Sequence, residues 1–152
     1  FKTIEGCQPP MPPSAQQQHW VRVDSKKLTQ AVSNVLSNAY KYSPNGGSGS
    51  VELVQPENES QAGQIGIRIT DHGIGMTQAQ LARIFERFYR ADASGKLSGT
   101  GLGMSIVEEI VTLNRGHIDV ESTHGKGTSV ILWWPADPGG QSPTKTTSGA
   151  IP

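Results

Sequence analysis

Four polar side chains in one stretch of the sequence could bind a ligand together. The stretch SNVLSNAYKYSP (33–44) carries Asn34, Asn38, Lys41 and Tyr42 among apolar residues. In a helix with about 100° between successive residues, these four side chains fall on one stripe along the border of the apolar face. An amide oxygen, an ammonium and a phenol in this arrangement could contact a ligand beside the helix, although a solvated helix edge would give the same pattern.

The apolar residues of this region predict the helix that positions the stripe. They follow the i, i+3, i+4, i+7 spacing of an amphipathic helix: Leu28, Ala31, Val32, Val35, Leu36 and Ala39. Asp24 is suited to cap the N-terminus of this helix, and Pro44 is suited to end it.

Three glycine clusters follow, each at the end of a predicted regular element: DHGIG (71–75), GTGLG (99–103) and GKGT (125–128). Glycine lets a backbone adopt positive φ and approach a ligand closely, and N–H groups at the helix start after GTGLG would favour a phosphate. Met104 and Gln78 break the G-x-G-x-x-G pattern, and no G-x-x-x-x-G-K-[ST] occurs. The sequence therefore does not support a dinucleotide fold or a P-loop, and each cluster alone could be a turn.

The periodicity of the chain predicts an α+β sandwich. We expect a mixed, mostly antiparallel sheet of about five strands, with about three helices packed on one face. The expected strands are 20–24, a strand starting at 51–54, 64–70, and a hairpin of 117–122 with 128–134. A second helix is predicted after a Thr77–Gln80 capping box, with an apolar stripe of Leu81, Ile84, Phe85 and Phe88. A third is predicted from about 101–103 to 116.

The composition is that of one ordinary domain. The chain has 152 residues, and its 13 basic and 13 acidic residues cancel, so charge gives no argument for nucleic acid or an anionic membrane. The longest apolar run, Val130–Trp134, is far shorter than a membrane span. A lone Cys7 excludes an internal disulfide and fits a reducing compartment. We expect a Pro- and Gln-rich linker (1–18), a domain (19–135) and a disordered tail (136–152).

In order and spacing, these motifs resemble those of the ATP-binding catalytic domain of bacterial sensor histidine kinases, which has the Bergerat (GHKL) fold. SNVLSNAYKYSP resembles the N box of that family, DHGIGM the first G box and IFERFYRAD the F box. GTGLGMSIVEEIV resembles the second G box, and GKGTSVIL the last glycine motif with its closing strand. The resemblance runs from about Val21 to Trp134 and implies an ATP site between the helices and the sheet.

The resemblance implies a role for each residue of the first two motifs. Asn38 would give its amide oxygen to the Mg²⁺ that bridges the ATP phosphates, a donor that suits this ion. Asn34 would lie beside the phosphates, and Lys41 would neutralise their charge. Tyr42 would line the ribose–phosphate side, and Asp71 would accept a hydrogen bond from the exocyclic amine of adenine. Gly73 and Gly75 would turn beneath the purine, with Ile74 and Met76 as an apolar wall.

By the same resemblance, the later motifs surround the phosphates. RADASGKLSG (90–99) corresponds to the ATP lid, with Arg90 and Lys96 as its phosphate-facing cations. The phosphate-cradling backbone would come from Gly99, Gly101, Leu102 and Gly103, with Thr100 as a further ATP-binding residue. Thr128 would bridge to Asp71 or to the adenine edge. Phe85 and Phe88 are expected in the core and as a lid anchor rather than in contact with the ligand.

The activity implied is transfer of the γ-phosphoryl group of ATP to a histidine, with Asn34, Asn38, Lys41 and Arg90 as catalytic residues. None of His19, His72, His117 and His124 lies in a phosphoacceptor context. The acceptor histidine would therefore lie on a separate dimerisation helical domain, with onward transfer to a response regulator. We expect an excised, monomeric catalytic domain from the cytoplasmic portion of a parent kinase, with no nucleic-acid partner.

Three alternatives stay open. ATP-hydrolysing proteins of this fold place a glutamate where Asn34 stands, and because an amide cannot abstract a proton from water, Asn34 favours a kinase. An anti-sigma-factor serine kinase usually departs from the FERFYRAD pattern. A degenerate module that binds a partner without turnover is disfavoured by the intact nucleotide motifs.

Overall fold

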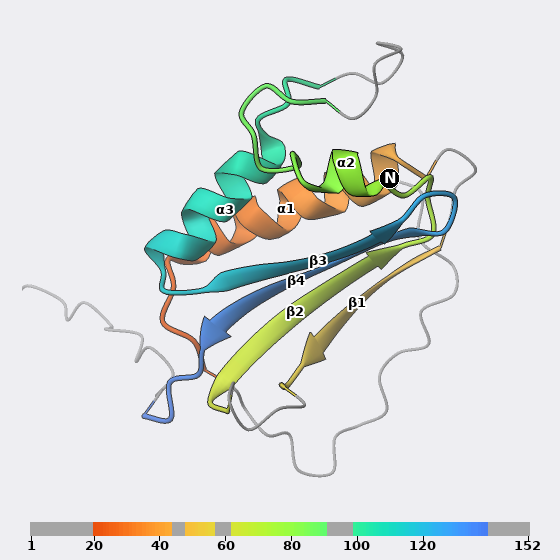
Figure 1. The fold of residues 1–152 in the computed structure, drawn as a ribbon. Coiled ribbons are helices and arrows are strands. Elements are labelled where there is room, and N and C mark those ends of the chain that lie inside the picture. Colours follow the sequence, from red (N-terminus) through yellow and green to blue (C-terminus); the bar gives the residue numbers. More distant parts are fainter. Residues whose placement is uncertain (1–19, 44–47, 57–61, 91–98, 140–152) are drawn as a thin grey trace, which may run out of the picture.

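The computed structural model describes residues 20–43, 48–56, 62–90 and 99–139. The elements occur in the order α1 (Ser25–Lys41), β1 (Gly49–Val54), β2 (Gln64–Asp71), α2 (Gln78–Leu81), α3 (Gly103–Leu113), β3 (His117–Thr123) and β4 (Gly127–Pro135). The four strands form one sheet in the order β1-β2-β4-β3, and each neighbouring pair is antiparallel. The described helices lie on one face of this sheet (Figure 1), which confirms the predicted fold class.

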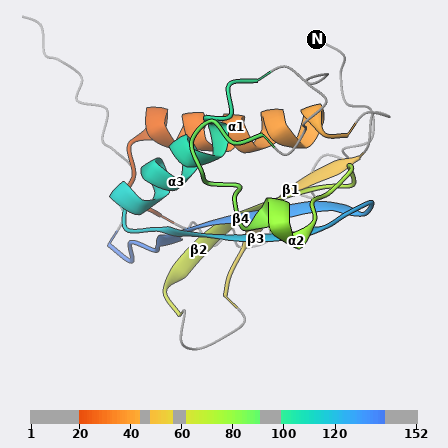
Figure 2. The ribbon, with the colours of Figure 1, turned by 45° about the horizontal axis from the view of Figure 1, so that its top comes forward.

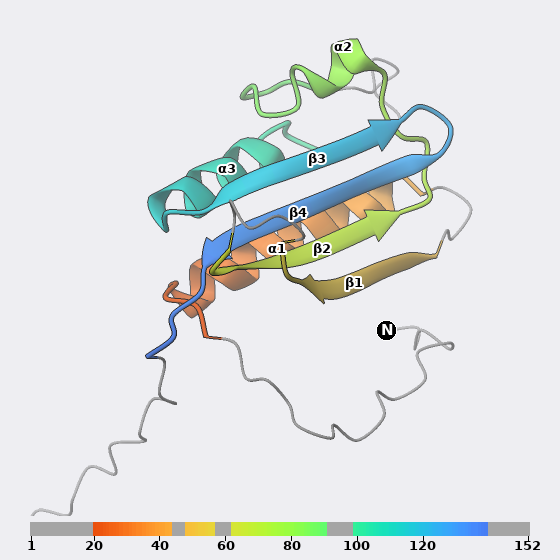
Figure 3. The same ribbon diagram turned by 60° about the horizontal axis from the view of Figure 1, so that its bottom comes forward.

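Helices α1 and α3 lie side by side over the sheet (Figure 2), and the opposite face of the sheet carries none of the described helices (Figure 3). The core lies between these two layers. It is built from Ala31 and Val35 of α1, Met104, Val107, Ile110 and Val111 of α3, and Ile69, Val130, Leu132 and Trp134 of the sheet. Burial of this apolar surface is what fixes α1 over the strands that end at the site.

The first helix begins where the sequence predicts. The Asp24 carboxylate accepts hydrogen bonds from the backbone N–H groups of Lys26 and Lys27, at 2.8 and 3.0 Å, and so caps α1. Pro44, the predicted end of this helix, lies outside the described residues, as do the predicted 1–18 linker with Cys7 and residues 140–152 of the predicted tail.

The sheet has four strands in the described residues, one fewer than predicted. Residues 20–24 contribute only an isolated bridge, between Val21 and Ala136. The cap at Asp24 turns the chain into α1 at once, which leaves too short an extended segment for a full strand. Arg22 and Asp137 form an ion pair of 2.9 Å beside this bridge.

The second helix is shorter than predicted. Its capping box of Thr77 and Gln80 is present, but α2 ends at Leu81 and turns follow it. Ile84 and Phe85 pack against the core as predicted. Phe88 does not: its backbone has φ 64°, its side chain is 73% exposed, and its N–H donates to the Gly101 carbonyl at 2.9 Å. A positive φ cannot continue a right-handed helix, and the hydrogen bond ties this turn to the segment before α3.

Candidate nucleotide-binding site

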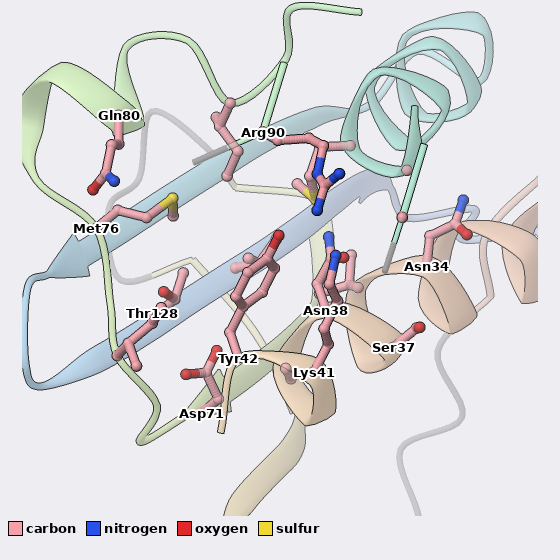
Figure 4. Close-up of a pocket in the computed structure, with 18 of the residues that line it drawn as sticks. Asn34, Ser37, Asn38, Lys41, Tyr42, Asp71, Met76, Gln80, Arg90 and Thr128 are labelled. Atoms are coloured by element: carbon pink, nitrogen blue, oxygen red, sulfur yellow. The ribbon is translucent and has the colours of Figure 1, made fainter. Parts of the chain in front are cut away.

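A cavity of about 280 Å³ opens between α1, the sheet and the segments that flank α2 and α3. Fourteen of the predicted site residues line it: Asn34, Asn38, Lys41, Tyr42, Asp71, Ile74, Gly75, Met76, Arg90, Gly99, Thr100, Gly101, Gly103 and Thr128. Figure 4 shows that the labelled side chains come from α1 and the residue after it, from the sheet, from α2 and from the loops beside them. The fold therefore brings motifs that are far apart in sequence to one cavity.

The polar stripe of α1 faces this cavity. Asn38 lies beside the start of α3, because a Cβ on Gly103 would be 3.9 Å from the Asn38 amide nitrogen. The Lys41 ammonium nitrogen lies 4.8 Å from the centre of the Tyr42 ring and only 2.7 Å from the place that a Cβ on Gly99 would take. Glycine at position 99 therefore leaves room for this ammonium.

Asp71 ends β2 on the side of the sheet that carries the helices. One of its carboxylate oxygens, Oδ1, accepts a hydrogen bond from the Gly73 N–H at 2.8 Å. The loop that follows is fixed against the end of α1, because the Ile74 N–H donates to the Tyr42 carbonyl at 3.0 Å. This arrangement leaves the second carboxylate oxygen, Oδ2, to meet a ligand.

The glycines of this loop are required by close backbone contacts. A Cβ on Gly73 would lie 2.1 Å from the Tyr42 carbonyl oxygen, and one on Gly75, which has φ +59°, would lie 2.0 Å from that of Thr123. Gly73 does not line the cavity. Its position is explained by packing against α1, since no side chain fits there.

The described residues on either side of the predicted lid lie close together beside the cavity. Gly101 has φ +73°, and a Cβ there would lie 2.7 Å from the Phe88 backbone. Arg90, Gly99 and Thr100 line the cavity, whereas Lys96 and the rest of 91–98 lie outside the described residues. Leu102 does not line the cavity and instead takes the N-cap position of α3.

Comparison with known proteins decides the family. Residues 23–138 match the family described as histidine kinase-, DNA gyrase B-, and HSP90-like ATPase. The chain belongs to this family. It is 39% identical over 118 residues to the sensor histidine kinase WalK of Bacillus subtilis, covering 76% of the chain and 19% of that relative. It is 40% identical over 124 residues to the sensor protein kinase WalK of Staphylococcus epidermidis, covering 80% and 20%.

Solved structures give the same result. The mycobacterial sensor histidine kinase MprB matches with a TM-score of 0.66 and 35% identity, over 79% of this chain and 77% of that one. Full-length ShkA in complex with AMPPNP matches with a TM-score of 0.57 and 28% identity, over 72% of this chain and 21% of that one. The resemblance to the ATP-binding catalytic domain of histidine kinases is therefore confirmed. The chain spans about a fifth of the length of the curated relatives described above.

Four polar or aromatic residues of this histidine kinase-like ATPase domain line the cavity although they were not predicted: Ser37, Gln80, Tyr89 and His124. Gln80 had already been assigned to the capping box, and its side-chain oxygen does accept from the Thr77 N–H at 2.8 Å. Tyr89 lies under the Arg83 guanidinium, 4.2 Å from ring centre to Cζ. Ser37 lies three residues after Asn34 on the same helix, so helical spacing could have indicated it, but no local pattern indicates His124.

The ionisable groups with shifted pKa values lie at the surface rather than in the cavity. The hydrogen bond between Arg83 and Glu86 raises the pKa of the arginine and lowers that of the carboxyl. The hydrogen bond from Arg22, together with one from the Gly139 N–H, lowers the pKa of Asp137. Both pairs involve exposed side chains, where ion pairs contribute little to stability.

The residues present fit a magnesium ion that is carried in with phosphates. Among the described residues, no cluster of three His, Cys, Asp or Glu side chains could hold a metal. The amides of Asn34 and Asn38 instead line the cavity one helical turn apart. Magnesium prefers oxygen ligands and usually keeps several waters while it binds substrate phosphates and one or two protein groups. No described helix is long and apolar enough to cross a membrane.

Proposed function

We propose that this domain binds Mg²⁺-ATP in the cavity and donates the γ-phosphoryl group to a histidine of its parent protein. The main support for the proposal is that the two ends of the cavity carry different chemical groups. At one end, the Asp71 carboxylate is held by Gly73 at 2.8 Å with one oxygen left to accept from the adenine amine. At the other end, amides and an ammonium of α1 face the glycines before α3.

The phosphate end combines several weak contributions. Lys41 and Arg90 supply positive charge, and the N–H groups at the start of α3 supply the positive end of a helix dipole. The amide oxygen of Asn38 would hold the magnesium ion, which supplies charge neutralisation at the phosphates when bound, and Asn34 would lie beside the phosphates. Lys96 belongs to the same proposed set by its place in the lid.

The purine end is proposed to use the apolar wall of Ile74 and Met76, which line the cavity, with Tyr42 beside the ribose. Gly75, Gly99, Gly101 and Gly103 would let the backbone come close to the nucleotide. Thr128 would take part at the adenine edge. Thr100 completes the proposed ATP-binding set. Gly73 and Leu102, which do not line the cavity, are proposed to support it, Gly73 by holding Asp71 and Leu102 by starting α3.

The identity of residue 34 favours transfer to a histidine over hydrolysis. An amide cannot act as a general base for water, and phosphoryl transfer depends mainly on positioning and on charge stabilisation. We therefore propose a helical phosphoacceptor domain of the parent kinase as the partner and a response regulator as the next acceptor. The domain is proposed to be monomeric and to face the cytoplasm in its parent, with no nucleic-acid partner.

Titration calorimetry with ATP and a non-hydrolysable analogue, with and without Mg²⁺, tests binding. Incubation with γ-labelled ATP tests transfer, alone and with the helical phosphoacceptor domain of the parent added in trans. We expect binding, no label on the isolated domain, and label on the added domain. Absence of binding at millimolar ATP, or label retained on the isolated domain, would refute the proposal.

A further inference from the structure

A row of polar side chains crosses three strands at the purine end of the cavity. Thr128 of β4 is paired in register with Asp71 of β2 on one side and with Ser122 of β3 on the other. Side chains directly opposite in antiparallel strands share a face of the sheet, with Cβ atoms about 4.5–5.5 Å apart. Asp71 and Thr128 line the cavity, so Ser122 stands directly behind Thr128.

The Ser122 hydroxyl has three partners, which use its full hydrogen-bonding capacity. It accepts from the Met76 N–H at 2.8 Å, donates to the Gly127 carbonyl at 3.1 Å and lies 2.9 Å from the Thr128 hydroxyl. A hydroxyl has one proton and two acceptor positions. Because the Gly127 carbonyl can only accept, it takes the Ser122 proton, and Thr128 must then donate its own proton to Ser122.

We propose that Ser122 orients the Thr128 hydroxyl so that only its oxygen lone pairs face the cavity, and that this selects purines with an amino group at C6. The inference rests on the proposed nucleotide-binding function. The adenine amine has two N–H bonds, and Asp71 and Thr128 offer one acceptor for each. A 6-oxo purine presents an acceptor to the same two acceptors and is rejected. Ser122 acts through Thr128 and is therefore a positioning residue.

The same strands provide a matched control on the other face of the sheet. Thr70 and Ser129 are paired in register one position away from Asp71 and Thr128, and the Thr70 hydroxyl donates to the Ser129 hydroxyl at 3.3 Å. Successive side chains of a strand point to opposite faces, so this pair faces away from the cavity. Ser129→Ala removes a comparable hydroxyl pair without contact with the nucleotide.

The experiment measures the dissociation constants of Mg²⁺-ATP and Mg²⁺-ITP, whose bases differ at C6, for the wild type and for matched variants. Ser122→Ala frees the Thr128 proton to donate to a 6-oxo group. We expect the preference for ATP over ITP to fall by about 3- to 10-fold, the effect of roughly one hydrogen bond. Ser122→Thr should retain the preference, and Ser129→Ala should leave it unchanged.

Thr128→Val distinguishes orientation of the hydroxyl from general support of the loop. Thr128→Val should by itself lower the preference for ATP over ITP. In the Thr128→Val background, Ser122→Ala should have no further effect on the ratio of the two dissociation constants. The test therefore does not depend on the stability of one variant. An equal loss of both nucleotides in Ser122→Ala, or a change of ratio that persists in the Thr128→Val background, would overturn the inference. Failure of the wild type to bind ATP would instead refute the proposed function.

Discussion

Replacing Asp71 by asparagine should weaken the binding of ATP and strengthen the binding of ITP. The structure explains why the loop after Asp71 should keep its conformation in this variant. Oδ1 of Asp71 accepts from the Gly73 N–H at 2.8 Å, and the amide oxygen of an asparagine can keep that bond. The amide nitrogen then takes the place of Oδ2. A group that only accepts is thereby replaced by one that only donates, with almost no change in shape.

The magnitude follows from the contact that is lost. A hydrogen bond to a charged group contributes about 1.5–3 kcal/mol, so ATP should bind roughly 10- to 150-fold more weakly to Asp71→Asn. ITP carries an acceptor at C6 and should gain one neutral hydrogen bond of about 1 kcal/mol, or about 5-fold in affinity. The ratio of the two dissociation constants, measured by calorimetry, therefore reports the role of Asp71.

Asp119→Asn is the matched control for this experiment. Asp119 lies on β3, and its carboxylate accepts from the Trp133 indole N–H at 2.7 Å. Trp133 and Asp119 do not line the cavity. This variant should leave both dissociation constants unchanged. An equal loss of ATP and ITP in Asp71→Asn would show that Asp71 supports the loop and does not read the base.

Three further predictions concern the metal, the backbone and pH. Asn38→Ala should weaken ATP binding by about 10- to 150-fold when Mg²⁺ is present and far less without it; an equal loss in both conditions in calorimetry would make Asn38 structural. Arg115 has φ 60°, so Arg115→Gly should stabilise the domain by about 1 kcal/mol and raise Tm by about 3–6 °C, and a lower Tm in thermal unfolding would contradict this. Arg22 lowers the pKa of Asp137, so the ionised Asp137 side chain stabilises the folded state fully above the ordinary carboxyl pKa. This contribution to the free energy of unfolding is lost as pH falls through the lowered value. The difference in urea midpoint between wild type and Asp137→Asn should therefore disappear in acid, whereas a constant difference from pH 7 to 2 would refute the linkage.

Local features of the fold could be predicted because they depend on neighbouring residues. The apolar period fixes α1 and α3, and the Asp24 cap and the Thr77–Gln80 capping box each join groups two or three residues apart. The alternation of residues 64–70 likewise predicted β2. The stripe on α1 was predicted by the same logic, since side chains on one helix share a face whatever surrounds them.

Contacts between distant segments were decided only by the tertiary structure. No local pattern shows that Gly73 must be glycine because of the Tyr42 carbonyl, or that the Phe88 N–H reaches Gly101 while its side chain is exposed. The resemblance suggested Thr128 near Asp71, but its hydroxyl partner is Ser122. That partnership depends on the register of β2, β4 and β3. Register is fixed by burial of one whole face of each strand against α1 and α3, and that burial exists only once the layers have packed.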